Sequence, residues 1–200
     1  TPALAVSAAV FENLTYDPQR DLAPVAMLSV FPSVLVVHPS VPAKTPQELV
    51  AYAKANPGRL NFASAGNTSA IRFAFEHLAQ ITGMKAVHIA YKGSAPSAQA
   101  MLAGESHTMM MTLVDALPHI KSGKLRALAA TTIERIPSMR ELPTLAETLA
   151  PGFDYIIWHG FYVPSGTPKD VVAKLNRDVN TVLRQPDVSS RLTGLGKDVG

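Results

Sequence analysis

The sequence lacks cysteine altogether and is poor in charged side chains. Without a cysteine in its 200 residues, the chain cannot be a disulfide scaffold, carry a thiol nucleophile or form a cysteine zinc site. Charged residues make up 16% of the chain, below the roughly 25% that is usual for soluble domains. The net charge of +3 is not concentrated in a basic run, which argues against a nucleic-acid partner. No apolar stretch approaches the ~18 residues that a membrane-spanning helix requires.

Apolar residues are plentiful, at 47% of the chain, and they recur in a pattern of strands and helices. The apolar residues between Pro24 and Pro39 predict two short buried strands around Phe31-Pro32-Ser33. Strands, small-residue loops and helices then alternate, and the expected strands are residues 60–63, 87–91, 108–113 and 125–131. Alternation of this kind predicts an α/β architecture with parallel strand pairing.

Capping residues mark the ends of the expected helices. Thr45 and Glu48 predict a helix that begins with a capping box, and Gly83 predicts the end of the next helix. Asp115 is expected to cap a short helix, and Thr167 is expected to cap the last long helix. The apolar residues of that last helix predict a buried stripe, which consists of Val171, Val172, Leu175, Val179, Val182 and Leu183.

Two loops of small residues are the most informative feature of the sequence. Residues 64–69 and 92–94 each lie between the expected end of a strand and the expected start of a helix. In open α/β sheets, ligands bind beyond the carboxyl ends of the strands, and helix N-termini attract anions. Gly66 and Gly93 would let the backbone approach a carboxylate or a phosphate closely. Further hydroxyl donors would come from Ser64, Thr68, Ser69 and Ser94. Ordinary helix capping explains the same residue types, so both interpretations stay open.

Two larger side chains are candidates for the same site. Arg72 lies about one turn into the helix after the first loop, where it could pair with a carboxylate in a bidentate manner. A solvated surface arginine is the ordinary alternative. Trp158 could form a wall of a ligand cleft, and packing in a core or interface is the ordinary explanation for a single tryptophan.

Catalytic and metal-binding signatures are missing from the sequence. It contains no G-x-S-x-G or H-E-x-x-H motif, and no two of its six histidines are three or four residues apart. Ser64, His88 and Asp115 could be drawn as a triad only by free choice, and His88 is more simply a half-buried strand residue. We therefore expect no enzymatic activity, no cofactor and no metal ion.

Several segments together resemble one known family. They are residues 61–67 (NFASAGN), 87–96 (VHIAYKGSAP) and 117–129 (LPHIKSGKLRALA), with shorter matches at residues 16–18, 21–25, 142–147 and 164–168. In this order, and over nearly the whole chain, they resemble the Bug family, the extracytoplasmic solute receptors of tripartite tricarboxylate transporters.

The resemblance implies an α/β fold of the two-lobed periplasmic-binding-protein kind (type II-like, or Venus flytrap), in which the lobes close over a ligand. It implies a monomeric periplasmic receptor that binds a small organic acid and delivers it to membrane transporter subunits, with no nucleic-acid partner. Family ligands are mostly small carboxylates, bound by loops at helix starts. Besides Arg72 and Trp158, the site residues carried over by position are Ser64, Ala65, Gly66, Asn67, Thr68, Ser69, Tyr91, Gly93, Ser94 and Ala95.

Three positions depart from the family pattern. Thr68 stands where the family usually has a second glycine, Arg72 replaces a frequent histidine, and Met111-Thr112 replaces a common Asp-Asn pair. The missing aspartate removes a partner for an ammonium or hydroxyl group, whereas Arg72 adds a partner for a carboxylate. The sequence therefore predicts a ligand with more acid than amine character, such as a dicarboxylate or an aromatic acid.

The resemblance also predicts how the chain is divided. Residues 38–154 are expected to form a nearly complete second lobe, and residues 1–37 with 155–200 a partial, discontinuous first lobe. Family segments are expected to be missing at both ends, and no signal peptide is visible. The alternative is the effector-binding domain of a cytoplasmic transcription regulator with the same fold, although this sequence contains no helix-turn-helix.

Overall fold

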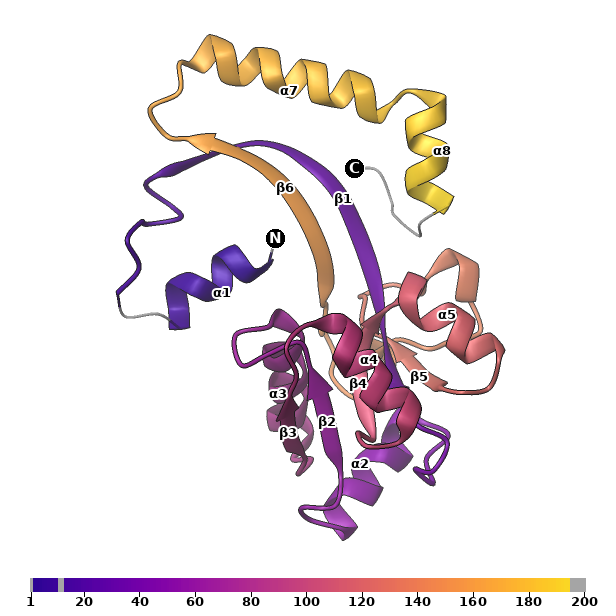
Figure 1. Cartoon of the computed structure of the whole chain (residues 1–200). Helices are drawn as coiled ribbons and strands as arrows, with labels where there is room; N and C mark the ends of the chain where they lie inside the picture. The colour runs from indigo at the N-terminus through magenta and orange to yellow at the C-terminus, as the bar shows by residue number, and fades with distance from the viewer. Residues whose placement is uncertain (1, 11–12, 195–200) are drawn as a thin grey trace. The chain divides into compact units, whose positions relative to one another are not determined.

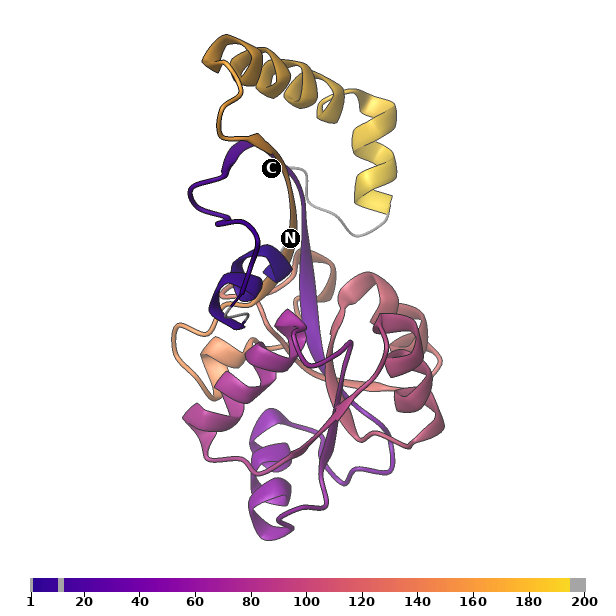
Figure 2. The ribbon, with the colours of Figure 1, turned by 60° about the vertical axis from the view of Figure 1, so that its left-hand side comes forward.

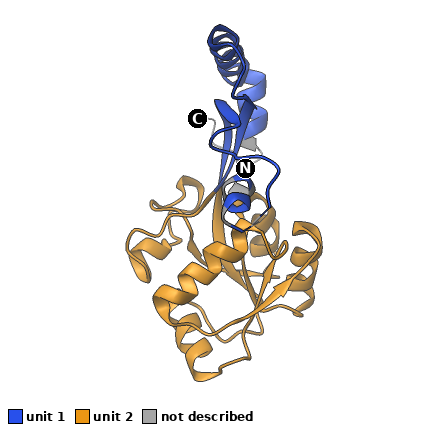
Figure 3. Cartoon of the chain, turned by 90° about the vertical axis from the view of Figure 1, so that its left-hand side faces the viewer, with its two compact units in different colours: residues 1–31, 157–200 blue, residues 32–156 orange. Residues whose placement is uncertain are grey.

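The chain is divided into two compact units. The computed structural model describes residues 2–10 and 13–194. Residues 32–156 form the larger unit, and residues 1–31 together with 157–200 form the smaller unit (Figure 3). Two strands, β1 (Leu22–Val37) and β6 (Ile156–Pro164), contain the points where the chain passes from one unit into the other.

The larger unit is built on a mixed β-sheet. The strand order is β3-β2-β4-β1-β5, so β1 separates β4 from β5. β2 is parallel to both β3 and β4, as the sequence predicted, whereas β1 is antiparallel to β4 and β5. The bounds of these strands are Asn61–Ser64 for β2, Val87–Ala90 for β3, Thr108–Thr112 for β4 and Arg126–Ala130 for β5.

β1 corrects one sequence prediction, and its direction was not predicted. It is one continuous strand of 16 residues, where two short strands around Phe31-Pro32-Ser33 were expected. Ser33 pairs with Thr112 of β4 at the start of that ladder, and Pro32 precedes it, so the amide that proline lacks interrupts none of these bonds. The sequence did not predict the antiparallel direction of β1, because the apolar pattern of a strand does not indicate the direction of a partner strand that is distant in the chain.

Helices cover both faces of this sheet, as Figures 1 and 2 show. α2, α3 and the short α6 pack on one face, whereas α4, α5 and the 3₁₀ helix η1 pack on the other. Their bounds are Pro46–Ala55 for α2, Ala70–Thr82 for α3, Ser94–Ala103 for α4, Leu113–Lys121 for α5, Pro137–Met139 for η1 and Leu145–Thr148 for α6.

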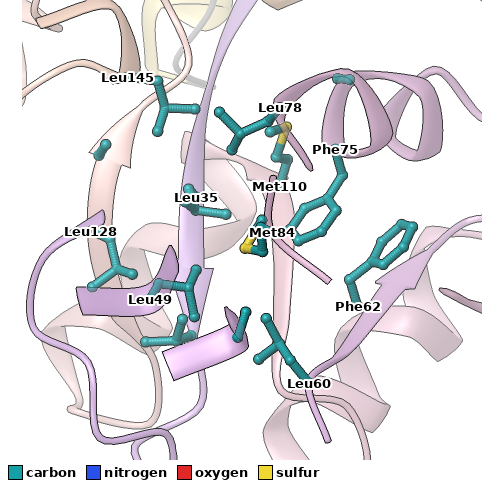
Figure 4. Packing of buried hydrophobic residues seen from close by; sticks show 14 of the residues in the cluster. Leu35, Leu49, Leu60, Phe62, Phe75, Leu78, Met84, Met110, Leu128 and Leu145 are labelled. Carbon is teal, nitrogen blue, oxygen red and sulfur yellow. The ribbon is translucent and has the colours of Figure 1, made fainter. Parts of the chain in front are cut away.

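Side chains of the central strands point alternately to the two faces of the sheet, and they form one hydrophobic core layer on each face. Leu35 and Val37 of β1 point into the layer under α2 and α3, and Val34 and Val36 point into the opposite layer. The methionine run of β4 divides in the same way, because Met110 joins the first layer and its two neighbours join the second. Figure 4 shows the first layer, where leucine, phenylalanine and methionine side chains interdigitate between the sheet and the helices.

The helix ends confirm two predicted signals and correct two others. Thr45 caps α2 by accepting a hydrogen bond from the Glu48 amide (3.1 Å), although the Glu48 carboxylate accepts from the Lys44 amide instead of completing a capping box. α3 ends at Gly83, whose φ of 68° lies in the left-handed region that favours glycine. The prediction that Asp115 caps a helix is wrong, because α5 begins two residues earlier, after Thr112.

In the smaller unit, the described residues form the first part of β1, the paired strand β6 and three helices. These helices are α1 (Pro2–Val10), α7 (Lys169–Leu183) and α8 (Pro186–Gly194), and Figure 1 shows α7 leading into α8. The Asn176 side chain of α7 donates a hydrogen bond to the Val25 carbonyl of β1. None of the described helices combines the length and the apolar character needed to cross a membrane.

α7 corrects two further predictions. It begins at Lys169 after Pro168, so Thr167 is not its cap; the Thr167 amide donates to the Pro164 carbonyl instead. Of the apolar stripe expected to be buried, Leu183 is buried, but Val171 and Val182 are 41% and 48% exposed. Helical periodicity identifies which face of a helix is apolar, and it does not show whether another element covers that face.

Candidate ligand-binding site

The two small-residue loops lie side by side in the larger unit. They are named loop 1 (residues 64–69, beginning at the last residue of β2) and loop 2 (residues 91–95, which follows β3 and includes the first two residues of α4). Because β2 and β3 are parallel neighbours, both loops leave the same edge of the sheet. Two backbone hydrogen bonds join them, from the Tyr91 amide to the Ser64 carbonyl (3.0 Å) and from the Gly93 amide to the Ala65 carbonyl (3.2 Å).

Both loop glycines adopt backbone conformations that other residues rarely adopt. The φ of Gly66 is 139° and the φ of Gly93 is 116°. A Cβ atom on Gly66 would lie 3.6 Å from the Tyr91 carbonyl oxygen, whereas a Cβ atom on Gly93 would meet nothing within 4 Å. Gly66 therefore lies where the two loops are in contact, and the backbone at Gly93 borders open space.

The two helices that follow the loops begin differently. Ser69 caps α3, because its hydroxyl accepts a hydrogen bond from the Arg72 amide (3.3 Å). α4 follows Gly93, and no described side chain caps its first turn. Since the first amides of a helix have no partner within the helix, the start of α4 presents donors and a positive dipole end.

Ser64 is a buried support of loop 1. Its side chain is fully buried, and its Oγ lies 2.6 Å from Nε2 of His88 on β3. The same oxygen lies 3.0 Å from the Gly66 carbonyl oxygen and 3.2 Å from the Gly66 amide nitrogen. From the sequence, His88 could be paired with Ser64 only as a freely chosen triad member, and a half-buried strand position was the simpler prediction, so its support of loop 1 was not predicted. The contact follows from the pairing of His88 with Phe62, two residues before Ser64, and no local pattern in the sequence reports that register.

Arg72 is held by its own helix and by loop 1. Its Nε lies 2.8 Å from Oε1 of Glu76, and its Nη1 donates to the Asn67 carbonyl (2.9 Å). The guanidinium carbon also lies 5.8 Å from the centre of the Phe73 ring. Glu76 stands four residues after Arg72, so this ion pair was visible in the sequence as a helical i, i+4 spacing.

The remaining candidate residues differ in exposure. Asn67, Ser94 and Ala95 are exposed, whereas Ala65 and Thr68 are partly buried. Tyr91 is also partly buried, and its hydroxyl lies 3.0 Å from Oγ of Ser106. The exposed members therefore come from the tip of loop 1 and from the start of α4.

Trp158 belongs to the smaller unit, on β6, and is partly buried there. A Cβ atom on Gly160 would lie 3.2 Å from Cζ3 of Trp158 and 2.8 Å from Cε2 of Tyr162. Glycine at position 160 therefore makes room for the two aromatic side chains that flank it on the same face of the strand.

The electrostatic environment distinguishes the two histidines that bond to β2. Burial lowers the pKa of His88, Arg72 lowers it further, and Glu76 partly opposes this shift. Burial also lowers the pKa of His107, with a smaller contribution from His38. His107 accepts a hydrogen bond at Nδ1 from the Asn61 amide (2.9 Å), so its unprotonated form is the one that supports the start of β2.

The described residues do not assemble a catalytic triad or a metal centre. Ser64 and His88 are in contact, but the Asp115 carboxylate accepts a hydrogen bond from the Thr112 hydroxyl. Within residues 2–10 and 13–194 there is no group of three or more histidine or acidic side chains placed to hold a metal ion. The chemistry offered by this part of the larger unit is recognition by backbone amides and hydroxyl groups.

Comparison with known proteins gives one consistent result. The family model described as "Tripartite tricarboxylate transporter family receptor" matches residues 2–199. A relative from Pseudomonas sp. (strain P51), the UPF0065 protein of the tcbD-tcbE intergenic region, is 35% identical over 96% of this chain. MatC from Rhodopseudomonas palustris, solved with bound malate, is 34% identical over 97% of the chain with a TM-score of 0.85. The periplasmic binding protein BugD is 30% identical over 98% of the chain with a TM-score of 0.86.

These likenesses define the class of protein. The mixed sheet with helices on both faces is part of a two-lobed α/β solute-binding protein of the periplasmic-binding-protein fold. The chain belongs to the family of tripartite tricarboxylate transporter receptors, as its resemblance to the Bug family predicted, and the members of this family are binding proteins, not enzymes. It spans 58% of the length of the Pseudomonas relative and 66% of the length of MatC.

Proposed function

We propose that this chain is the ligand-binding part of a periplasmic receptor that captures a small carboxylate and delivers it to a tripartite membrane transporter. The family match over residues 2–199 supports the receptor role, and the malate in MatC supports the ligand class. The observation that carries the proposal in this chain is the pair of hydrogen-bonded glycine loops at one edge of the sheet.

Loop 2 is the proposed anchor of the carboxylate. The backbone at Gly93 borders open space, and the start of α4 has no side-chain cap among the described residues. Backbone amides at such a helix start can donate to a carboxylate without help from a charged side chain. The low charged fraction of the chain, 16%, is consistent with recognition of this kind.

The other site residues surround this anchor in the proposal. Exposed and partly buried members of loop 1 contact the ligand from one side, and Arg72 gives the site its preference for acids over amines. In that role Arg72 would bind the ligand in competition with Glu76 and the Asn67 carbonyl, its partners in this structure. Trp158 would contribute from the first lobe.

The lobe assignment is part of the same proposal. Residues 38–154 would form the second lobe, and residues 1–37 with 155–200 would belong to the first. A ligand that contacts both lobes only in a closed form stabilises that form by its differential affinity for the two states. Small-angle scattering of the full-length protein should therefore show a smaller radius of gyration with ligand; identical profiles would argue against closure.

A pair of matched ligands tests carboxylate recognition directly. Calorimetric titration of the chain with malate should give a measurable dissociation constant, because both carboxylates of malate can accept hydrogen bonds from backbone amides. Malamide has the same carbon skeleton with neutral amides in place of the carboxylates, and it should not bind at the same concentrations. Equal binding of the two compounds, or no binding of malate, succinate, adipate and benzoate alike, would refute the proposal.

A further inference from the structure

His88 holds loop 1 from the neighbouring strand, and its ring is fixed in place. The imidazole stacks on Phe62 at 4.8 Å between ring centres, and Phe62 in turn stacks on Phe75 of α3 at 4.2 Å. Phe62 and Phe75 are buried in the core. The position of Nε2 relative to Ser64 is therefore set by a column of rings, and the imidazole has little freedom to turn away.

The Ser64 hydroxyl has more polar neighbours than it has protons. It carries one hydrogen, and its possible acceptors are Nε2 of His88 at 2.6 Å and the Gly66 carbonyl at 3.0 Å. The Gly66 amide donates to the hydroxyl oxygen in either case. When Nε2 is unprotonated, Ser64 donates to His88; when Nε2 carries a proton, His88 donates to Ser64, which then donates to the Gly66 carbonyl.

We propose that His88 is a positioning residue for ligand binding, which switches the hydrogen bond of Ser64 and so sets how firmly the Gly66 peptide is held. The inference rests on the proposed function of loop 1. Gly66 touches loop 2 through its neighbour Ala65, whose carbonyl accepts from the Gly93 amide, so a shift at Gly66 reaches the proposed anchor of the carboxylate. His88 itself is not placed in contact with the ligand.

The groups around His88 determine where the switch operates. From α3, Arg72 disfavours the charged imidazole and Glu76 favours it; from β2, Phe62 and Ser64 carry no charge. Burial has the largest effect, and it also disfavours the charge. The imidazole is therefore neutral at pH 7.5. The proposal places its one proton on Nδ1 in that form, so that Nε2 accepts from Ser64, and the switch is expected as the pH falls below 6.5, the ordinary value for histidine.

The first experiment needs no ligand. In amide nitrogen–proton correlation spectra between pH 8 and pH 5, the Gly66 signal of the wild type should move with a midpoint below 6.5. In His88→Gln, whose side chain keeps a hydrogen-bond acceptor but cannot take up a proton, the Gly66 signal should stay still. His77→Gln, which removes an exposed histidine of α3, is the matched control and should leave the Gly66 titration unchanged. The inference would be overturned if the Gly66 amide shift of the wild type did not change between pH 8 and pH 5. It would also be overturned if the Gly66 shift of His88→Gln changed with pH as it does in the wild type.

The second experiment asks whether the positioning matters for binding. At pH 7.5, His88→Phe keeps a ring to stack on Phe62 but removes the acceptor, and Ser64→Ala removes the hydroxyl. Each should weaken malate binding about tenfold, the loss expected for one hydrogen bond, and the double variant should be no weaker than either single one. Losses that multiply in the double variant would show that His88 does not act through Ser64. If the wild type does not bind malate but Gly66 titrates as described, the proposed ligand is wrong and the positioning by His88 stands.

Discussion

α3 and α4 begin in different ways, although each follows a strand of the same parallel pair. At α3, the Ser69 hydroxyl caps the first turn, and the Ser64 side chain of the preceding loop is buried against His88. At α4, Gly93 precedes the helix and no described side chain caps it. On the proposed function, this difference makes loop 1 the support of the site and loop 2 the source of backbone donors for the ligand.

The largest effect is expected from Gly93→Ala. The backbone of Gly93, at φ 116° and ψ 175°, is strained for alanine, and a change in loop 2 would turn its amides away from the carboxylate. Malate binding should weaken by at least about tenfold, measured by calorimetry. Gly58→Ala is the matched control, because Gly58 also has a positive φ (78°) and open space around its Cβ position but lies in the turn before β2, at the opposite end of that strand from loop 1. If Gly93→Ala and Gly58→Ala bound malate with equal affinity, loop 2 would have no special role in binding the carboxylate.

β2 provides a second contrast, since a histidine bonds to each of its ends. Burial, with a smaller contribution from His38, lowers the pKa of His107 in the folded protein, and its unprotonated Nδ1 accepts from the Asn61 amide, so the stability that it supports is present above pH 6.5. That stability should be lost as the pH falls from 6.5 through the lower pKa of the folded state, by at most about 1.4 kcal/mol per pH unit. Urea unfolding at several pH values measures this loss. His107→Asn keeps an acceptor near the position of Nδ1 and should flatten the profile; an unchanged profile would contradict the role given to His107.

The caps of the two helices predict a smaller difference in stability. Ser69→Ala removes the cap of α3 and should lower the free energy of unfolding by about 1 kcal/mol. Ser94→Ala, at the first residue of α4, removes an exposed hydroxyl that caps nothing among the described residues and should leave stability nearly unchanged. Urea unfolding at pH 7.5 compares the stabilities of the two variants. A larger loss of stability for Ser94→Ala than for Ser69→Ala would contradict the assignment of loop 1 as the support and loop 2 as the ligand anchor.

A smaller loss of stability than at the α3 cap is expected at the Arg72–Glu76 ion pair. Both side chains are partly exposed, so Glu76→Gln should cost only about 0.5 kcal/mol of stability. The same variant frees Arg72 to turn toward the ligand and should tighten malate binding, whereas Arg72→Ala should weaken it. If neither variant changes malate affinity, Arg72 acts as a brace for loop 1 and not as a partner of the carboxylate.

The sequence was sufficient to locate the two loops because both signals are local. Small residues between an apolar strand and an amphipathic helix mark a strand–helix turn, and parallel pairing of successive units brings such turns to one edge of the sheet. The end of α3 at Gly83 and the cap at Thr45 were predictable for the same reason, since each depends on a few neighbouring residues.

The features that escaped prediction depend on distant parts of the chain. β1 is antiparallel to β4 and β5, and no pattern within β1 reports the direction of those partners. Val171 and Val182 of the predicted buried stripe are exposed, because periodicity alone does not show whether another element covers a residue. His88 was undervalued since its contact with Ser64 arises only when β3 pairs in register with β2.

The most direct measurement is a map of amide chemical shifts as malate is added to the nitrogen-labelled chain. If loop 2 anchors the carboxylate, the largest changes should fall on the amides of Ser94 and Ala95 at the start of α4, with smaller changes at Ala70 and Ile71 of the capped α3. Changes that are larger at Ala70 and Ile71, or that leave both helix starts unmoved while malate binds, would contradict the assignment of loop 2 as the anchor.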